Sequence, residues 1–227
     1  MDHRLGKIKI ISLREQVITA IRDAIIEGKF KPGEKIPEQE LAQQLGVSRT
    51  PIREAIRILE QQGLVVTVPK SGTYVTESNI EKIKEAIVVR VAIEQLALRE
   101  AIEHLDDREW GEFMNALEDI LHSMQVASED GDGVALTELD IEWHAHVVDA
   151  AHNQYLSWLW RSSGLQYLIW SPERSLYPLA KDKWWEVIYG RHKNLLDSLK
   201  SRNIEKCCAA IKEHIEQKYQ DLDGYLH

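Results

Sequence analysis

The chain has 227 residues, 44% of them apolar and 29% charged, which is typical of a globular protein and long enough for two domains with separate cores. No apolar run approaches the roughly 20 residues that span a bilayer, and the N-terminus has no signal-peptide core, so we expect a cytoplasmic protein without a membrane segment. A formal net charge of −9 excludes a uniformly basic nucleic-acid-binding protein.

The first predicted helix covers residues 12–28. Ser12 and Glu15 have the spacing of a capping box, and apolar residues follow at helical intervals. Residues 31–33 then turn the chain, and residues 35–36 can form a short strand.

Residues 40–64 have the pattern of a helix-turn-helix, with apolar residues on one face of a short helix and on one face of a second helix. Ser48 is the expected N-cap of the second helix, and Pro51 is tolerated in its first turn because the missing N–H would have no partner there. The other face of this helix carries Arg49, Thr50, Arg53 and Arg57. Three cations and a hydroxyl at a helix start suit the DNA major groove, although a solvated basic face would have the same pattern.

Two short β-branched segments, residues 64–68 and 73–75, are predicted to pair as a hairpin, the wing. Lys70 and Gly72 lie in its turn, where they can approach the DNA backbone or minor groove. The charge distribution agrees with a DNA-binding N-terminal part. Residues 1–77 hold 12 Lys and Arg against 10 Asp and Glu, whereas the remainder holds 16 against 27.

Residues 28–75 resemble the winged-helix domain of the GntR family of bacterial transcription regulators. The resemblance rests on a PG turn, the LAQQLGVSRTPIREA segment and the GTYV wing, which follow in the family's order. It implies a ligand-responsive regulator, commonly a repressor, that binds a short palindromic operator in double-stranded DNA as a homodimer. The DNA-binding positions that it implies are Gln39, Arg49, Thr50, Pro51, Arg53, Lys70 and Gly72. Of these, Gln39 stands where several relatives carry an arginine.

The fold class is therefore mainly α, with a winged helix-turn-helix domain at residues 1–77 and an all-helical domain at residues 78–227. The second domain is expected to have helices at about 78–104, 106–127, 134–151, 154–170, 182–201 and 203–222. A capping-box sequence at Ser78 opens the first, and residues 106–109 start the second. Helices of this length form an antiparallel bundle that can hold a ligand in its core. The adjacent Cys207 and Cys208 cannot join distant segments, which excludes a disulfide framework.

Histidines are the chemical signal of the helical domain. Asp140 and His144 are four residues apart and so project from the same helix face, and His192 and His214 lie on later predicted helices. A carboxylate and three imidazoles that meet inside a bundle would suit Zn, Ni or Mn. Scattered histidines also satisfy local hydrogen bonds, so spacing alone leaves the metal site open.

Residues from about 78 to 219 resemble the all-helical FCD effector domain of the FadR subfamily, in its shorter six-helix type. The resemblance implies that a divalent transition metal is held by Asp140, His144, His192 and His214, and that the metal helps to hold a small carboxylate effector. His146 and His152 do not match the ligand positions and are expected to be structural.

Two features of this domain have alternative interpretations. Arg90 matches an arginine frequent in the subfamily and would pair with the effector carboxylate, but a salt bridge to Glu94 one turn further on is equally compatible with the sequence. Five of the seven tryptophans fall within residues 158–185. They either pack between helices or, at Trp170 or Trp184, line the effector cavity.

Two rival functions use the same His/Asp cluster: a metal-dependent enzyme and a direct metal sensor. The sequence contains no nucleophile–base motif, Gly-rich phosphate loop or HExxH pattern, which favours a regulator over an enzyme.

Overall fold

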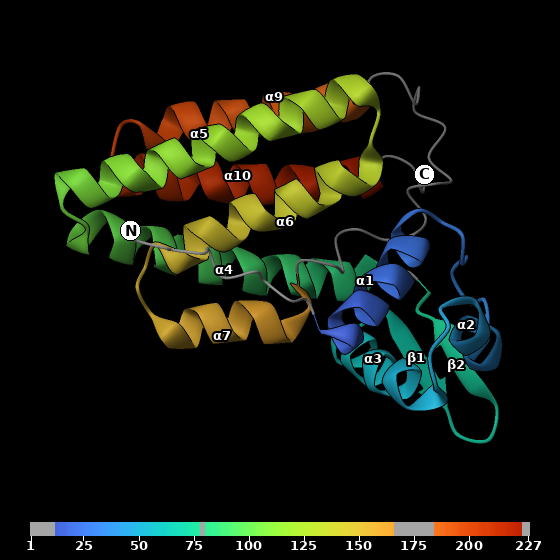
Figure 1. Ribbon diagram of the computed structural model, residues 1–227. Coiled ribbons are helices and arrows are strands. Elements are labelled where there is room, and N and C mark those ends of the chain that lie inside the picture. The colour runs from blue at the N-terminus through green and yellow to red at the C-terminus, as the bar shows by residue number, and fades with distance from the viewer. Residues whose placement is uncertain (1–11, 78–79, 166–183, 224–227) are drawn as a thin grey trace, which may run out of the picture.

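The computed structural model describes residues 12–77, 80–165 and 184–223. It shows a small N-terminal unit of three helices and a hairpin beside a larger helical bundle, each with its own hydrophobic core (Figure 1). The predicted fold class is confirmed. None of the helices within these described ranges is long and apolar enough to cross a membrane.

The N-terminal unit is a winged helix-turn-helix. Its elements in chain order are α1 (Leu13–Ile26), α2 (Glu38–Gln44), α3 (Arg49–Gln61), β1 (Val65–Val68) and β2 (Gly72–Val75). The capping box at the start of α1 forms as predicted: the Ser12 hydroxyl accepts from the Glu15 amide, and the Glu15 carboxylate accepts from the Ser12 amide. Helix α3 packs against α1 and α2 and buries Ile52 and Leu59 completely.

The wing is an antiparallel pair in which Val65 lies opposite Val75 and Val68 lies opposite Gly72. The short strand expected at residues 35–36 is reduced to a single bridge between Lys35 and Tyr74.

Two local expectations in the helix-turn-helix need correction. Ser48 occupies the N-cap position of α3, but its side chain makes no capping hydrogen bond. Leu45, expected on the buried face of the short helix, is the C-cap of α2 and is 38% exposed. Leu45 therefore lies where the helix ends, and the chain turns at the next residue, Gly46, which has a φ of 66°.

The helical bundle consists of α4 (Ile80–His104), α5 (Asp107–Asp130), α6 (Gly133–Asp149), α7 (Gln154–Ser163), α9 (Trp184–Leu199) and α10 (Ile204–Asp223). Helix α4 contacts α6, α7 and α10, and α5 packs against α6 and α9 (Figure 1). The capping box at Asp106 forms with Glu109, whereas the one predicted at Ser78 lies outside the described residues.

Helix α7 ends earlier than predicted. It stops at Ser163 because Gly164 adopts a left-handed conformation with a φ of 68°, and residues 166–183 lie outside the described part of the chain. The two cysteines are buried free thiols packed in the bundle, and burial raises the pKa of both.

Candidate metal centre and DNA-binding surface

Three helices bring the four predicted metal ligands together in the bundle core. The ligands are Asp140 and His144 on α6, His192 on α9 and His214 on α10. Asp140, His144 and His192 are 0% exposed, and His214 is 4% exposed. One ligand atom from each side chain lies within 4.8 Å of all the others. The convergence that spacing alone left open is therefore present.

The distances between these atoms fit one shared ion. His192 Nε2 lies 3.2 Å from Asp140 Oδ1, and His214 Nε2 lies 3.2 Å from His144 Nε2. Adjacent ligands that are each about 2.1 Å from a zinc-like ion lie roughly 3.0–3.4 Å apart. His144 Nε2 and Asp140 Oδ1 are 4.0 Å apart, which suits a wider ligand angle.

Hydrogen bonds on the far side of two imidazoles prepare them for metal binding. His192 Nδ1 lies 2.9 Å from the carbonyl oxygen of Ile188, and a carbonyl can only accept, so Nδ1 carries a proton and Nε2, on the side of Asp140, is the nitrogen that can bind an ion. His144 Nδ1 lies 2.6 Å from Glu94 Oε2, which favours the same tautomer. Within the described chain, His192 Nε2 has no hydrogen-bond partner of its own. The donor set fits a divalent Zn, Ni or Mn ion.

Glu94 links the metal ligands to Arg90. Arg90 is fully buried on α4, and its Nε donates to Glu94 Oε1 at 2.6 Å. The alternative salt bridge is thus present, but it uses only one guanidinium nitrogen. Neither Nη1 nor Nη2 of Arg90 has a hydrogen-bond partner among the described residues. Two unsatisfied, buried N–H groups of a cation are suited to an anionic ligand.

Two tryptophans enclose this site, and only one of them belongs to the predicted cluster. The ring of Trp143 lies 5.3 Å from the rings of His144 and His192. The ring of Trp160 lies 5.0 Å from the Arg90 guanidinium. Trp143 precedes a ligand on the inward face of α6, a signal that was visible in the sequence.

The cavity lining predicted for Trp170 or Trp184 stays a prediction. Trp158 is 66% exposed. Trp170 and the side chain of Trp184 lie outside the described part of the chain. His146 is not a member of the ligand cluster: its Nδ1 lies 3.0 Å from the carbonyl oxygen of Glu142, which agrees with the structural role expected for it.

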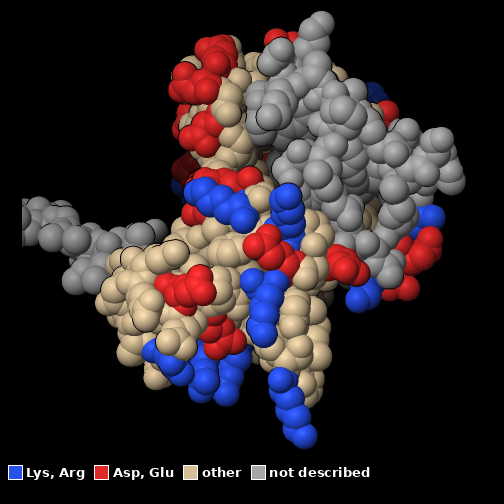
Figure 2. Space-filling model, turned by 90° about the vertical axis from the view of Figure 1, so that its right-hand side faces the viewer, with Lys and Arg blue, Asp and Glu red and all other residues tan. Residues whose placement is uncertain are grey.

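The start of α3 is an exposed basic surface. Arg49, Thr50 and Arg53 are exposed, and the first turn of α3 contains no acidic residue. Because the Ser48 side chain does not cap the helix, a phosphate oxygen can accept from the first amide groups of α3. Figure 2 shows basic side chains projecting from the lower end of the N-terminal unit, with acidic side chains on the bundle above.

The wing adds cations beside α3. Lys70 is exposed at the wing tip with a φ of 64°, and Gly72 has a φ of 136°. The Lys35 side chain lies against Gly72, where a Cβ would be 2.6 Å from its Cε, and its Nζ is 5.9 Å from the centre of the Tyr74 ring. Sequence analysis missed Lys35, which is 37 residues away from Gly72 in the chain.

Glu38 joins the wing to the two helices. Its carboxylate accepts from the Thr73 hydroxyl at 3.0 Å and lies 3.7 Å from Arg53 Nε. Next to it, Gln39 is exposed on α2, and Pro51 is half-buried in the first turn of α3. The predicted DNA-binding residues therefore lie on elements that these contacts hold together.

Residues 13–75 match the bacterial regulatory proteins of the gntR family, and residues 85–217 match the FCD domain. The chain belongs to the GntR family. The uncharacterized HTH-type transcriptional regulator YdhC of Bacillus subtilis is 31% identical over 88% of this chain and 84% of that protein. The probable D-xylose utilization operon transcriptional repressor of Paenarthrobacter nicotinovorans is 28% identical over 89% of this chain and 87% of its own. Among solved structures, Escherichia coli McbR/YncC has a TM-score of 0.76 at 22% identity, covering 96% of this chain and 100% of its own.

Membership confirms the predicted family and decides between a regulator and an enzyme. The two matched families and the similar proteins are transcription regulators. This GntR-family chain is accordingly a DNA-binding transcriptional regulator with an FCD effector domain, and not an enzyme.

Substitution of a metal ligand tests the candidate centre. His192→Ala should weaken metal affinity by at least about tenfold. Loss of a residue that only hydrogen-bonds to a metal ligand already costs about 10–100-fold in affinity, and loss of the ligand itself should cost no less. Metal content per chain after dialysis, measured by atomic emission, is the readout. His146→Ala, at a half-buried position of α6 outside the ligand cluster, should retain the wild-type ratio. An unchanged ratio in His192→Ala would exclude this site.

Substitution on α3 tests the DNA-binding surface. Arg49→Ala should weaken operator binding by about 1–3 kcal/mol if its guanidinium contacts a base. Affinity is measured at one salt concentration on an operator selected from random sequence and on unselected DNA. Arg108→Ala removes the same charge from the surface of α5 and should leave both affinities unchanged. Equal losses for Arg49→Ala on both DNAs would assign Arg49 to phosphate contact alone.

Proposed function

We propose that this regulator is a repressor whose operator binding is controlled by a small carboxylate bound between Arg90 and a metal ion in the FCD domain. The observation that carries the proposal is the buried guanidinium of Arg90. Two of its nitrogens have no hydrogen-bond partner among the described residues, and it shares Glu94 with the candidate metal ligand His144.

The chemistry of the pocket selects an anion. Glu94 compensates the charge of Arg90 through one nitrogen, and a carboxylate can accept from the other two in the bidentate geometry typical of arginine. A Zn, Ni or Mn ion on the three histidines and Asp140 would supply a second positive anchor and leave coordination positions for a ligand oxygen. Trp143 and Trp160 limit the room beside these groups, which favours a small acid.

A homodimer is the assembly that this function requires, because two winged helix-turn-helix domains related by a two-fold axis match the two halves of a palindromic operator. One side of α4 supports it. The exposed residues along this side are Glu85, Val88, Val89, Ala92, Leu96 and Arg99. They recur every three or four residues, so they form one stripe that has apolar residues in its middle and opposite charges at its ends.

This stripe is self-complementary about Ala92. If a second copy of α4 packs antiparallel across a two-fold axis at Ala92, Glu85 faces Arg99 of the second copy, since each lies seven residues from Ala92. Val88 faces Leu96 of the second copy by the same argument. The small Ala92 side chain lets the two helices approach closely.

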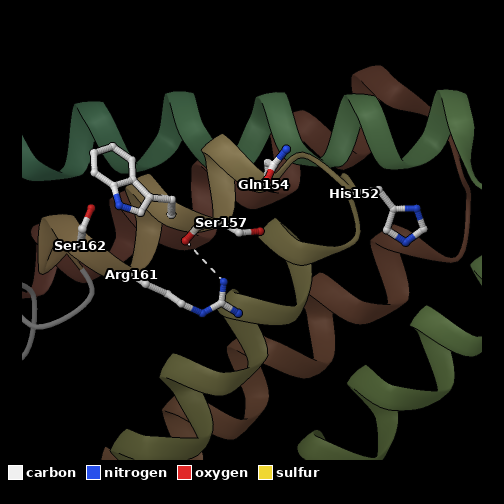
Figure 3. Close-up of a pocket in the computed structure, with 6 residues that line it drawn as sticks. His152, Gln154, Ser157, Arg161 and Ser162 are labelled. Atoms are coloured by element: carbon white, nitrogen blue, oxygen red, sulfur yellow. Dashed lines mark hydrogen bonds between the residues drawn. The ribbon is translucent and has the colours of Figure 1, made fainter.

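Helix α7 extends the apolar surface beside α4. Tyr155 and Trp158 are 78% and 66% exposed on its outer side. Trp158 borders a surface hollow of about 560 Å³ that Gln154 and Arg161 also line (Figure 3). Large exposed aromatic side chains beside a hollow are typical of a protein–protein contact.

A thermal-shift screen tests the effector proposal. We expect a small mono- or dicarboxylate to raise the melting temperature of the metal-loaded protein but not of the chelator-treated protein, because ligand binding to the folded state stabilises it. Arg90→Lys keeps the charge but loses the planar fork, so it should bind the same acid at least about tenfold more weakly while retaining metal.

The uncharged amide of that acid is the ligand control and should give no shift. An acid that shifts Arg90→Lys as much as the wild type would contradict the role of Arg90. Operator affinity that follows metal concentration, without a response to any acid, would instead make the ion itself the signal.

Substitutions on α4 test the dimer. Leu96→Asp places a charge in the apolar stripe and should convert the protein to a monomer in analytical ultracentrifugation. Val126→Asp, at a 47% exposed position on α5, is the matched control and should remain dimeric. A dimeric Leu96→Asp variant would move the interface elsewhere. The double variant Glu85→Arg/Arg99→Glu should dimerise more tightly than either single variant, because only the double restores opposite charges across the axis.

A further inference from the structure

The end of α7 rests directly on the end of the recognition helix α3. Gly164, the C-cap of α7, lies against the backbone of Gln62, the C-cap of α3. A Cβ at position 164 would be 2.4 Å from Gln62 Cα and 2.5 Å from Gln62 O. No side chain separates the two main chains at this point, so a displacement of either helix end also displaces the other.

One helical turn before this contact, α7 reaches the proposed effector site. Trp160 is 1% exposed, its ring lies 5.0 Å from the Arg90 guanidinium and its ring centre is 6.4 Å from that of His144. Trp160 and Gly164 are four residues apart. The aromatic wall of the site and the contact with α3 therefore belong to the same short, ten-residue helix.

We propose that α7 transmits the state of the effector site to the recognition helix, with Gly164 as the contact point. This inference rests on the proposed function for the nature of the ligand. A ligand that accepts from Arg90, or an ion that binds His144, changes the position of the guanidinium under Trp160. Movement of Trp160 shifts the C-terminal turn of α7 and, through Gly164, the C-terminal end of α3.

Glycine is required at this position for two separate reasons. Its φ of 68° disfavours other residues, and its missing side chain allows the close approach to Gln62. Gly131, the C-cap of α5, shares the first requirement, with a φ of 68°, but a Cβ there would meet nothing within 4 Å. Gly131→Ala is therefore a matched control, since it introduces the same backbone strain without disturbing a contact between helices.

Hydrogen exchange of the full-length protein tests the link. The amides of residues 59–64 are followed without ligand, with Zn²⁺ alone, and with Zn²⁺ plus the acid that gives the largest metal-dependent thermal shift. We expect their exchange rates to change several-fold on ligand addition in the wild type and in Gly131→Ala. Gly164→Ala should bind Zn²⁺ and the acid as the wild type does, by calorimetry, but its residues 59–64 should not respond.

The possible results separate this inference from the proposed function. A Gly164→Ala variant that responds as fully as Gly131→Ala overturns the link, as does a wild type whose residues 59–64 are unaffected by bound ligand. If no acid binds any variant, the proposed effector function fails and the Zn²⁺ series alone decides the link. If Zn²⁺ does not bind either, the exchange rates without ligand test the link. Equal rates for residues 59–64 in Gly164→Ala and Gly131→Ala would then overturn the link between α7 and α3.

Discussion

A guanidinium in a protein core must be neutralised, and in this chain the residue that neutralises it also orients a candidate metal ligand. One carboxylate oxygen of Glu94 accepts a hydrogen bond from Arg90 Nε, and the other oxygen lies 2.6 Å from His144 Nδ1. Removal of Glu94 would leave a buried cation unpaired and His144 without its outer partner. The Glu94 carboxylate thus sets both the charge balance of the core and the orientation of a candidate metal ligand, so a change at Glu94 alters both.

Two helices of the bundle contribute side chains to this core and also contact the N-terminal unit. Helix α6 carries Asp140 and His144 inward, and the intervening Ile141 packs against the core of the N-terminal unit. Helix α7 carries Trp160 inward and meets α3 at Gly164. Helices α6 and α7 therefore connect the candidate metal site to the DNA-binding unit.

Local rules were sufficient to predict most elements and fewer of the contacts between them. The capping box at Ser12 marked a helix start correctly, because such a box involves residues only three apart, and residues 106–109 also start a helix as predicted. The end of α7 was missed, although Gly164 was visible, because an isolated glycine does not always end a helix. The Glu94–His144 contact was not predictable by spacing, since it joins residues 50 apart on different helices.

The four-residue cluster was predictable from the sequence for two reasons. Asp140 and His144 are a helical turn apart, and the family resemblance implied His192 and His214. What the sequence could not provide is the enclosure. Asp140, His144 and Arg90 are fully buried, and Trp143 and Trp160 pack on the same groups. A ligand of ordinary size cannot reach such a site unless the wall moves. Trp160 lies on α7, the shortest bundle helix in the described part of the chain, so among these helices its movement would admit a ligand at the lowest cost in lost packing. Entry and signalling would then use the same displacement, because any movement of α7 that uncovers Arg90 also acts on α3 through Gly164.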